Sequence, residues 1–226
     1  MARCPGGPPP VGGVVTESAA VRVALVTGGA RRLGRAFAEA LAADGLRIAV
    51  HHGHSAAEAR EVADGIRAAG GEAEVFEADL SQAEAARELP ARVVATFGRL
   101  DVLVNSAAVM ERIDVASTSV DDWERIINLN LRAPFFLAQQ AAPYLARERG
   151  TIVNIADLSG LEPWRHYPVH SISKAGVVML TKVLAAALAP EITVNGIAPG
   201  TVLLPDDWGD DRREFAPALA CRHVGR

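Results

Sequence analysis

Hydrophobic residues along the chain follow two alternating patterns from Val21 onward. VRVALVT, at residues 21–27, is a short run of β-branched and aliphatic residues, which predicts a buried strand. RAFAEALAAD, at residues 35–44, repeats its apolar positions at helical spacing and predicts a helix. The ordered part of the chain therefore begins with a strand, a Gly-rich turn and a helix.

The same alternation continues along most of the chain. Further strands are predicted at residues 46–52, 73–79, 99–108, 151–156 and 192–198. Further helices are predicted at residues 55–70, 82–98, 121–150 and 172–189. Alternation of this kind predicts right-handed crossovers and a Rossmann-type, doubly wound parallel β-sheet with helices on both faces, a three-layer α/β/α fold.

The two ends of the chain lack this pattern. Residues 1–20 combine Pro and Gly without an apolar stretch long enough for a signal peptide or a membrane span, which predicts a disordered tail before a domain at residues 21–226. After Pro199-Gly200 the chain becomes acidic and rich in turn residues, as in LLPDDWGDDRR at residues 203–213. One short helical candidate follows, and no further strand is predicted.

Composition narrows the class of protein. The chain has 226 residues, half of them hydrophobic, which suits one α/β domain. The net charge of -4 gives no long-range attraction for nucleic acid or anionic lipid, so we expect a small-molecule partner, with neither nucleic acid nor membrane involved. Cys4 and Cys221 form neither a disulfide framework nor a metal cluster, which favours a cytoplasmic protein without a metal site.

A Gly-rich turn, TGGARRLG at residues 27–34, connects the first strand to the first helix. Glycines there allow the backbone to approach a pyrophosphate, and the helix N-terminus offers free N–H groups and a positive dipole end. The pattern predicts a dinucleotide site that includes Gly28, Arg31, Arg32, Leu33 and Gly34. A tight connection without a ligand is the simpler alternative.

The end of the second predicted strand bears on the choice of dinucleotide. NAD-binding proteins place a carboxylate there for the ribose hydroxyls, whereas this chain reads His51-His52-Gly53-His54-Ser55. Arg32 and the pair His54 and Ser55 could bind a 2′-phosphate through charge-assisted hydrogen bonds, which favours NADP(H), and His51 is also a predicted cofactor-binding residue. A surface histidine cluster beside a solvated arginine is the alternative.

Several motifs together resemble the short-chain dehydrogenase/reductase family. They are TGGARRLG, Asp79-Leu80, Asn105-Ser106-Ala107, Asn130 within NLNL, and Pro199-Gly200. Arg32 and the HxxxSAAEA stretch that starts at His51 are most similar to the NADPH-dependent pteridine reductase branch. The resemblance implies cofactor contacts at Asp79, Leu80, Asn105, Ala107, Pro199 and Gly200, with Asp79 at the adenine, and a proton-relay water at Asn130.

The positions of the family's catalytic serine, tyrosine and lysine hold Asp157, His170 and Lys174. The resemblance implies that Asp157 orients the substrate, as in pteridine reductases, and that Lys174 holds the cofactor ribose. A solvated helix lysine is the alternative for Lys174. His170 departs from the family, and because imidazole transfers protons near neutral pH but is shorter than a phenol, it is either an altered acid or a sign of lost turnover.

Three further residues are candidates for contact with the substrate. Tyr167 would share a helix face with His170 and Lys174, unless Pro168 starts the helix and leaves Tyr167 in a loop. Trp164 could line the same pocket or serve only packing. Met110 stands where pteridine reductases tend to carry a stacking aromatic, which weakens the case for a pterin.

The sequence thus predicts an NADP(H)-dependent oxidoreductase that reduces a small carbonyl or pterin-like compound. A non-catalytic NADP(H)-binding homologue is the alternative because of His170. Family members also continue into another helix and a last strand, which this chain is expected to lack, so a chain without a stable fold is a third interpretation. The apolar helices around Asn130 and after Lys174 predict a homodimer or homotetramer.

Overall fold

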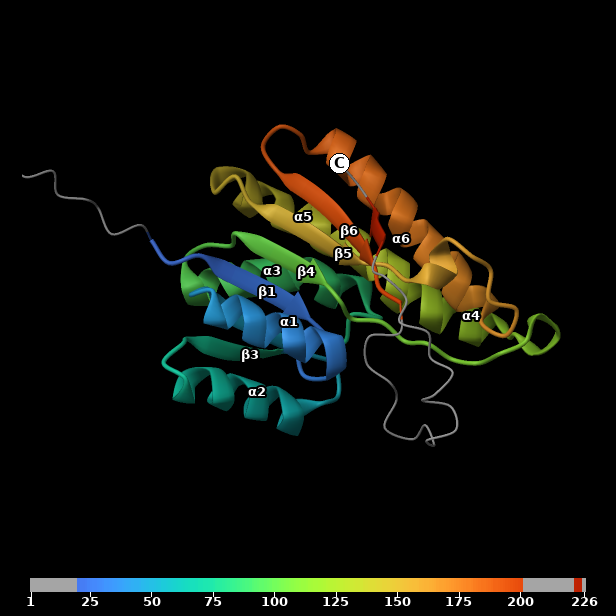
Figure 1. The fold of residues 1–226 in the computed structure, drawn as a ribbon, viewed down its shortest axis with the longest axis horizontal. Coiled ribbons are helices and arrows are strands. Elements are labelled where there is room, and N and C mark those ends of the chain that lie inside the picture. Colours follow the sequence, from blue (N-terminus) through green and yellow to red (C-terminus); the bar gives the residue numbers. More distant parts are fainter. Residues whose placement is uncertain (1–19, 201–221, 225–226) are drawn as a thin grey trace, which may run out of the picture.

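The computed structural model describes residues 20–200 and 222–224. A seven-stranded sheet in the order β3-β2-β1-β4-β5-β6-β7 forms its centre, with helices on both faces (Figure 1). The parallel strands are β1 Val23–Thr27, β2 Arg47–His52, β3 Ala73–Glu77, β4 Val102–Asn105, β5 Thr151–Ile155 and β6 Thr193–Ala198. The predicted doubly wound α/β/α architecture is confirmed. The predictions for residues 1–19 and 201–221 lie outside the described residues.

Two hydrophobic cores lie on opposite faces of the sheet. Leu25 and Val26, neighbours in β1, are both fully buried but belong to different cores, which is why this strand is continuously apolar. Residues of α1 and α2 pack on one face, and residues of α3, α5 and α6 pack on the other. The bounds are α1 Arg32–Ala43, α2 Ala56–Ala68, α3 Ala83–Phe97, α5 Ala133–Arg147 and α6 Pro168–Ala187.

The long helix predicted at residues 121–150 is divided. Its first part is α4, Val120–Ile127, and a π-helical turn, Asn128–Arg132, connects α4 to α5. Pro134 has no N–H, so the carbonyl of Asn130 cannot receive the usual α-helical bond from four residues ahead. Local rearrangement to a wider turn is the common response, and such turns recur at functional sites.

A short seventh strand was not predicted. β7, Arg222–Val224, pairs antiparallel with β6, and Gly196 lies opposite Val224. An edge strand offers unpaired N–H and C=O groups, which an extended segment can satisfy through its backbone alone. Hydrophobic patterning therefore gives little warning of such a strand.

Helix α6 is long and apolar enough to cross a membrane by composition. Just over half of its most apolar stretch, 56 %, is however buried inside the fold. Its buried residues include Val177 and Leu184, and it packs against β6 and the 3₁₀ turn η3, Leu158–Gly160. Packing in the core accounts for this composition.

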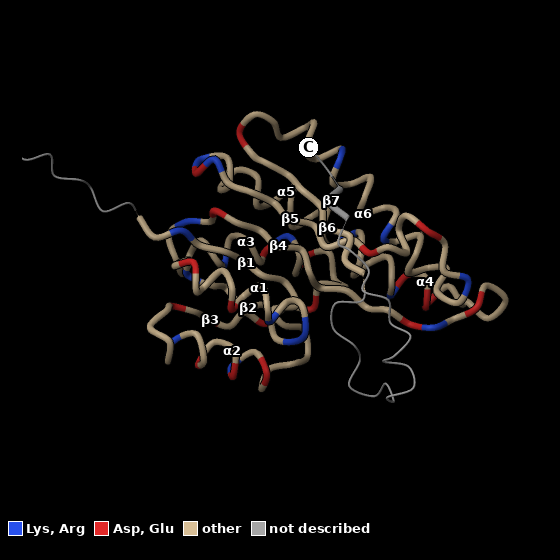
Figure 2. Tube along the Cα trace, in the orientation of Figure 1, with Lys and Arg blue, Asp and Glu red and all other residues tan. Residues whose placement is uncertain are grey.

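Charged side chains tie the surface helices to one another. Arg35 of α1 bonds both to Glu39 one turn ahead and to Glu61 of α2, each at 2.8 Å. Basic and acidic positions are interspersed over the trace (Figure 2). Exposed pairs of this kind contribute only about 0–1 kcal/mol each, so they orient α1 and α2 more than they stabilise the fold.

Candidate active site

The turn after β1 is fastened to the loop after β4 through Thr27. Its hydroxyl donates to the carbonyl of Val104 at 3.2 Å and accepts the N–H groups of Ser106 and Ala107 at 3.0 and 3.1 Å. Gly28 follows with a φ of 64°, and a Cβ atom there would lie 2.9 Å from Cα of Ala107. Only glycine meets both conditions without displacing the β4 loop.

Helix α1 starts in direct contact with this turn. A Cβ atom on Gly34 would lie 2.0 Å from the carbonyl oxygen of Gly28, so no side chain fits there. Arg31 precedes the helix and provides no side-chain cap, which leaves N–H groups of the first turn to an anion. Arg32 is exposed and has a φ of 50°, a conformation that favours glycine.

His51 lies beneath the turn rather than beside a ligand. Nδ1 accepts the N–H of Gly28 at 3.1 Å, and Nε2 donates to the carbonyl of Ala78 at 3.0 Å. Burial lowers the pKa of His51 to about 4, so the ring is neutral. Both ring nitrogens are occupied, so neither is left for the cofactor contact predicted at His51; the residue supports the Gly28 turn from the ends of β2 and β3.

The other residues predicted at the adenosine end are accessible. His54 is exposed and Ser55 is half-buried at the start of α2, after the end of β2, which pairs with β1. Asp79 is exposed after β3, and the hydrogen bonds from Ser81 lower the pKa of its carboxyl. The sheet therefore brings Arg32, His54, Ser55 and Asp79 to the carboxyl ends of neighbouring strands, where ligands bind in this type of fold.

Leu80, one of the predicted cofactor contacts, is a core residue. Leu80 is 2 % exposed and belongs to the core on the α3 and α5 face, so its side chain is not available to a cofactor. Leu33 is half-buried in the first turn of α1. Pro199 is buried and Gly200 is half-buried directly after β6, at the same edge of the sheet.

A row of buried amides lies at the carboxyl ends of β4 and β5. Nδ2 of Asn105 donates to Oδ1 of Asn154 at 2.8 Å, and Nδ2 of Asn154 donates to the hydroxyl of Thr181 at 3.0 Å. These bonds fix the amide of Asn105, whose Oδ1 is buried without a partner in the described structure. A buried unpaired acceptor is costly, so Asn105 Oδ1 is available for a ligand donor.

Asn130, in the π-helical turn, holds the loop after β4. Its Oδ1 accepts the N–H of Val109 at 2.8 Å, while its Nδ2 donates to the carbonyl of Val109 at 2.9 Å and to the hydroxyl of Ser173 at 3.1 Å. Nδ1 of His170 lies 3.4 Å from the same Nδ2 and 3.1 Å from the Val109 carbonyl. The structure therefore brings Asn130 and His170 together, as the sequence predicted.

His170 and Lys174 are one turn apart on α6 and both are buried. Nζ of Lys174 donates to the carbonyl of Ile155 at 2.8 Å, and loss of hydration lowers the pKa of Lys174 to about 8 although Asp157 opposes this. Burial, and then the charge of Lys174, also lower the pKa of His170. Asp157 begins the η3 turn, where its carboxylate accepts the N–H of Ser159 at 2.7 Å.

Tyr167 does not share the helix face of His170 and Lys174. Helix α6 begins at Pro168, so Tyr167 belongs to the preceding loop, and its ring meets that of Trp164 edge to face at a centroid distance of 6.0 Å. Met110 is exposed in the loop after β4, with an exposed fraction of 48 %. No described contact joins these three side chains to the buried polar groups of the site.

Sequence reasoning missed a link between the two loops that flank the site. Nδ1 of His166 lies 2.7 Å from the carboxylate of Asp114, and the N–H of Ile113 donates to the carbonyl of His166 at 3.2 Å. Partners 52 residues apart carry no local signal. The role of Thr27 was also missed. Its position as the first residue of the Gly-rich turn was a signal that could have identified it.

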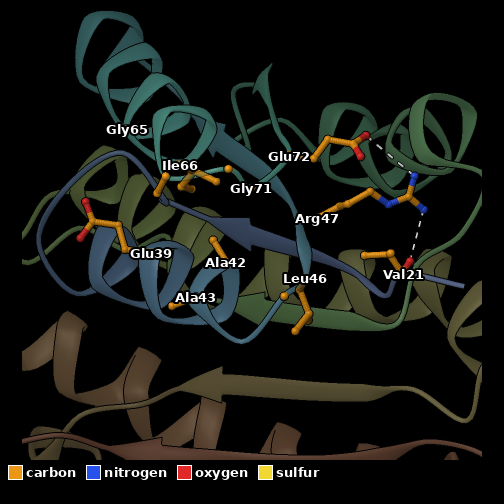
Figure 3. A pocket seen from close by; sticks show the side chains of 13 residues that line it. Val21, Glu39, Ala42, Ala43, Leu46, Arg47, Gly65, Ile66, Gly71 and Glu72 are labelled. Carbon is orange, nitrogen blue, oxygen red and sulfur yellow. Dashed lines mark hydrogen bonds and ion pairs between the residues drawn. The ribbon is translucent and has the colours of Figure 1, made fainter. Parts of the chain in front are cut away.

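A cavity of about 620 Å³ lies away from these residues, at the amino ends of the strands (Figure 3). Its walls are mostly small or aliphatic side chains, and its charged groups are Glu39, Arg47 and Glu72. Arg47 is already engaged, with the carbonyl of Phe97 at 3.0 Å and the carboxylate of Glu72 at 3.8 Å. None of the candidate site residues lines this cavity.

Comparison with known proteins agrees with this geometry. The family model described as short chain dehydrogenase matches residues 22–212. The 3-oxoacyl-[acyl-carrier-protein] reductase of Synechocystis sp. is 35 % identical over 183 residues, which cover 80 % of this chain and 74 % of the relative. The 3-oxoacyl-[acyl-carrier-protein] reductase FabG of Staphylococcus epidermidis is 34 % identical over 202 residues, 86 % of this chain and 83 % of the relative.

A solved structure agrees with these sequence comparisons. The crystal structure of acetoin dehydrogenase from Enterobacter cloacae superposes with a TM-score of 0.79 at 32 % identity, over 83 % of this chain and 75 % of that one.

Proposed function

Since the chain belongs to the short-chain dehydrogenase family, we propose that it is an NADP(H)-dependent oxidoreductase that interconverts a small carbonyl compound and its alcohol. The observation that carries the proposal is the turn at residues 27–34, where Gly28 and Gly34 allow the turn, the loop after β4 and helix α1 to pack in backbone contact. The turn would hold the pyrophosphate of a dinucleotide, and the nicotinamide of that dinucleotide would donate or accept the hydride.

The residues present fit a dinucleotide. Cβ atoms on Gly28 and Gly34 would lie 2.9 and 2.0 Å from backbone atoms, so only glycine allows the close turn that connects β1 to α1. The N-terminus of α1 has no side-chain cap, which suits a pyrophosphate. Asn105 Oδ1, buried without a partner in the described part of the chain, is an acceptor placed along the expected path of the cofactor.

The preference for NADP(H) over NAD(H) rests on charge. No carboxylate follows β2, where the sequence reads His52-Gly53-His54-Ser55. Arg32 is exposed beside it and occupies a backbone conformation that costs an arginine about 1 kcal/mol. Retention of a cation at a position that favours glycine supports a role for Arg32 in anion binding.

Lys174 and His170 would perform the proton chemistry. Because the pKa of Lys174 is lowered to about 8, its ammonium group releases a proton more readily than an ordinary lysine, and it would hold the ribose hydroxyls. Asn130 positions Val109 and lies beside His170. Asp157 contributes negative charge near both titrating groups.

A small carbonyl compound is favoured over a pterin as the substrate. The residues that resemble pteridine reductases, Arg32 and the stretch from His51 to Ala59, lie on the cofactor side of the site. Exposed Met110 provides little orientation for a flat ring. Two of the proteins named above are 3-oxoacyl-[acyl-carrier-protein] reductases and the third is an acetoin dehydrogenase, which supports a keto or hydroxy group as the reacting centre. We place the enzyme in the cytoplasm.

A non-catalytic NADP(H)-binding protein is the second candidate. The observation that favours it is the burial of His170, which is 3 % exposed. Both candidates require cofactor binding, so turnover with NADPH and a panel of ketones, or with NADP⁺ and secondary alcohols, separates them.

Replacement of Arg32 by glycine tests the cofactor assignment. We expect Arg32→Gly to bind NADPH at least tenfold more weakly, with little change for NADH, while the free energy of unfolding rises by up to about 1 kcal/mol because the positive φ is relieved. The measurements are titration of NADPH fluorescence and denaturant unfolding.

Arg149 provides the matched control. It is also exposed, also has a φ of 50°, and lies in the turn before β5. Arg149→Gly should change stability as Arg32→Gly does and leave NADPH affinity unchanged. Equal NADPH affinities in Arg32→Gly and the parent would overturn the NADP(H) preference, and a parent that binds neither dinucleotide would overturn the proposed function.

A further inference from the structure

The side chain of His170 has a fixed orientation set by its neighbours. Nδ1 lies 3.1 Å from the carbonyl oxygen of Val109 and 3.4 Å from Nδ2 of Asn130. Nε2 is buried and has no hydrogen-bond partner among the described residues. The question that decides the chemistry is which of the two nitrogens carries the proton of the neutral ring.

Asn130 cannot provide the proton between itself and His170. Its amide orientation is fixed because Oδ1 accepts the N–H of Val109. Its two Nδ2 protons go to the carbonyl of Val109 and to the hydroxyl of Ser173, at 2.9 and 3.1 Å. Ser173 gives its own hydroxyl proton to the carbonyl of His170 at 2.7 Å, so it accepts from Asn130.

The proton of the neutral imidazole is therefore on Nδ1. A carbonyl oxygen only accepts hydrogen bonds, so the 3.1 Å contact with Val109 requires Nδ1–H as the donor. The neutral ring has one N–H, which leaves Nε2 with its lone pair. His170 at this position is a hydrogen-bond acceptor at Nε2, whereas the tyrosine hydroxyl that the family resemblance leads one to expect is a donor.

The surrounding charges favour this neutral form. Burial lowers the pKa of His170, the ammonium group of Lys174 on the same helix lowers it further, and Asp157 from the loop after β5 opposes both. The net effect leaves the pKa below its ordinary value of 6.5. At neutral pH most molecules thus have an unprotonated Nε2.

We propose that Nε2 of His170 is a general base, which accepts the proton of an alcohol substrate at neutral pH. This inference rests on the proposed function and adds the protonation state in which the site acts. The alcohol O–H bond breaks and its proton bonds to Nε2, giving an imidazolium. The carbinol C–H bond breaks with its electron pair, the carbon–oxygen bond becomes double, and the oxidant is the oxidised nicotinamide dinucleotide, which is reduced.

Carbonyl reduction runs through the same groups in reverse and needs the imidazolium. Its fraction falls tenfold for each pH unit above the pKa of the ring, so reduction weakens across the neutral range while oxidation does not. A phenol at position 170, with an ordinary pKa of about 10, would stay protonated there and donate. The identity of residue 170 therefore sets the pH range over which reduction keeps a constant kcat/KM.

Nitrogen NMR tests the tautomer without cofactor or turnover. In protein labelled with ¹⁵N-histidine, we expect His170 at pH 7.5 to show a protonated Nδ1 and an unprotonated Nε2. His170→Gln identifies the signal by its loss; if that variant fails to fold, Lys174→Met identifies it by a raised titration midpoint. A protonated Nε2, or an imidazolium that persists at pH 7.5, would overturn the proposal.

The pH dependence of kcat/KM tests the consequence. For the parent we expect ketone reduction with NADPH to fall about tenfold per pH unit between pH 6.5 and 8, and oxidation of secondary alcohols with NADP⁺ to stay level. His170→Tyr should extend the plateau for reduction through pH 8. His166→Gln, at a half-buried histidine with no described contact to His170, should leave the pH dependence of both profiles unchanged.

The two proposals fail in distinguishable ways. A parent that binds no dinucleotide defeats the proposed function, whatever the tautomer. A parent that binds NADPH and reduces ketones at a constant kcat/KM from pH 6.5 to 8 defeats only the assignment of Nε2 as a general base.

Discussion

Two histidines of this chain have different roles because their ring nitrogens meet different partners. His51 has both nitrogens bonded to backbone groups, at 3.1 and 3.0 Å, and supports the Gly28 turn. His170 has one nitrogen bonded to Val109 and the other unpaired. Satisfied buried groups stabilise a fold, whereas a buried group without a partner is a candidate for ligand chemistry.

His51→Phe tests the supporting role through pH. Because the folded-state pKa of about 4 is below the ordinary 6.5, the unfolded chain binds the proton first, and the parent loses about 2 kcal/mol of stability from this residue between pH 6.5 and 5. Phenylalanine does not titrate and leaves the N–H of Gly28 and the carbonyl of Ala78 unpaired, so the variant should be destabilised at pH 7 by about 2–3 kcal/mol.

That difference should shrink to near zero at pH 5, and NADPH should bind the variant more weakly at pH 7. The measurement is urea unfolding of both proteins at pH 7 and 5. His166→Phe, at a partly exposed ring, is the control and should show no such trend. A constant difference across this pH range would contradict the assigned role.

At the scale of elements, the site depends on how closely backbones meet. Helix α1 touches the β1 turn at Gly34, and the π-helical turn between α4 and α5 presents Asn130 to the loop after β4. The first contact is between adjacent segments, whereas the second connects residues 21 apart in the chain, and together they shape the site at the edge of the sheet.

Gly34→Ala tests the contact between α1 and the turn. The new methyl group would lie 2.0 Å from the carbonyl oxygen of Gly28, so α1 must move away. We expect a loss of about 2–4 kcal/mol in unfolding free energy and at least a tenfold loss in NADPH affinity. Thermal unfolding with and without NADPH measures both effects.

Gly65→Ala is the matched control within a helix. Position 65 of α2 has open space where the methyl group would lie, so alanine should stabilise the protein by about 0.5–1 kcal/mol and leave cofactor binding unchanged. Equal effects of the two substitutions would show that the close approach at Gly34 has no special importance.

At the scale of the whole molecule, apolar side chains remain on the surface of the helices that cover one face of the sheet. Phe135 of α5 and Met179 and Val183 of α6 have exposed fractions of 42, 58 and 53 %. Apolar groups left exposed on surface helices favour association. We propose that the chain forms a homodimer or homotetramer through this surface.

Val183→Glu should then lower the mass measured by light scattering towards that of a monomer, because a buried, unpaired carboxylate opposes association. Val115→Glu is the control, since Val115 is 75 % exposed in the 3₁₀ turn Val115–Ser117 and lies outside this surface. A parent that is already monomeric would contradict the proposal.

The amino-acid sequence alone determined the six parallel strands, most of the helices and the place of the nucleotide turn. These features have local causes: continuous apolar runs for strands buried on both faces, helical spacing for amphipathic helices, and glycines where a backbone must approach a ligand. Asp157, His170 and Lys174 could be named because their spacing along the chain resembles that of a known family.

Tertiary structure alone decided what several of these residues do. His51 became a support and Leu80 a core residue because their environments are formed by strands far apart in the chain. The tautomer of His170 depends on Val109, Asn130 and Ser173, which no local pattern connects. The strand β7 pairs with β6 through backbone groups, which the pattern of side chains does not indicate. Burial and hydrogen-bond partners are properties of the folded chain, so they set the protonation and the chemistry that the sequence leaves open.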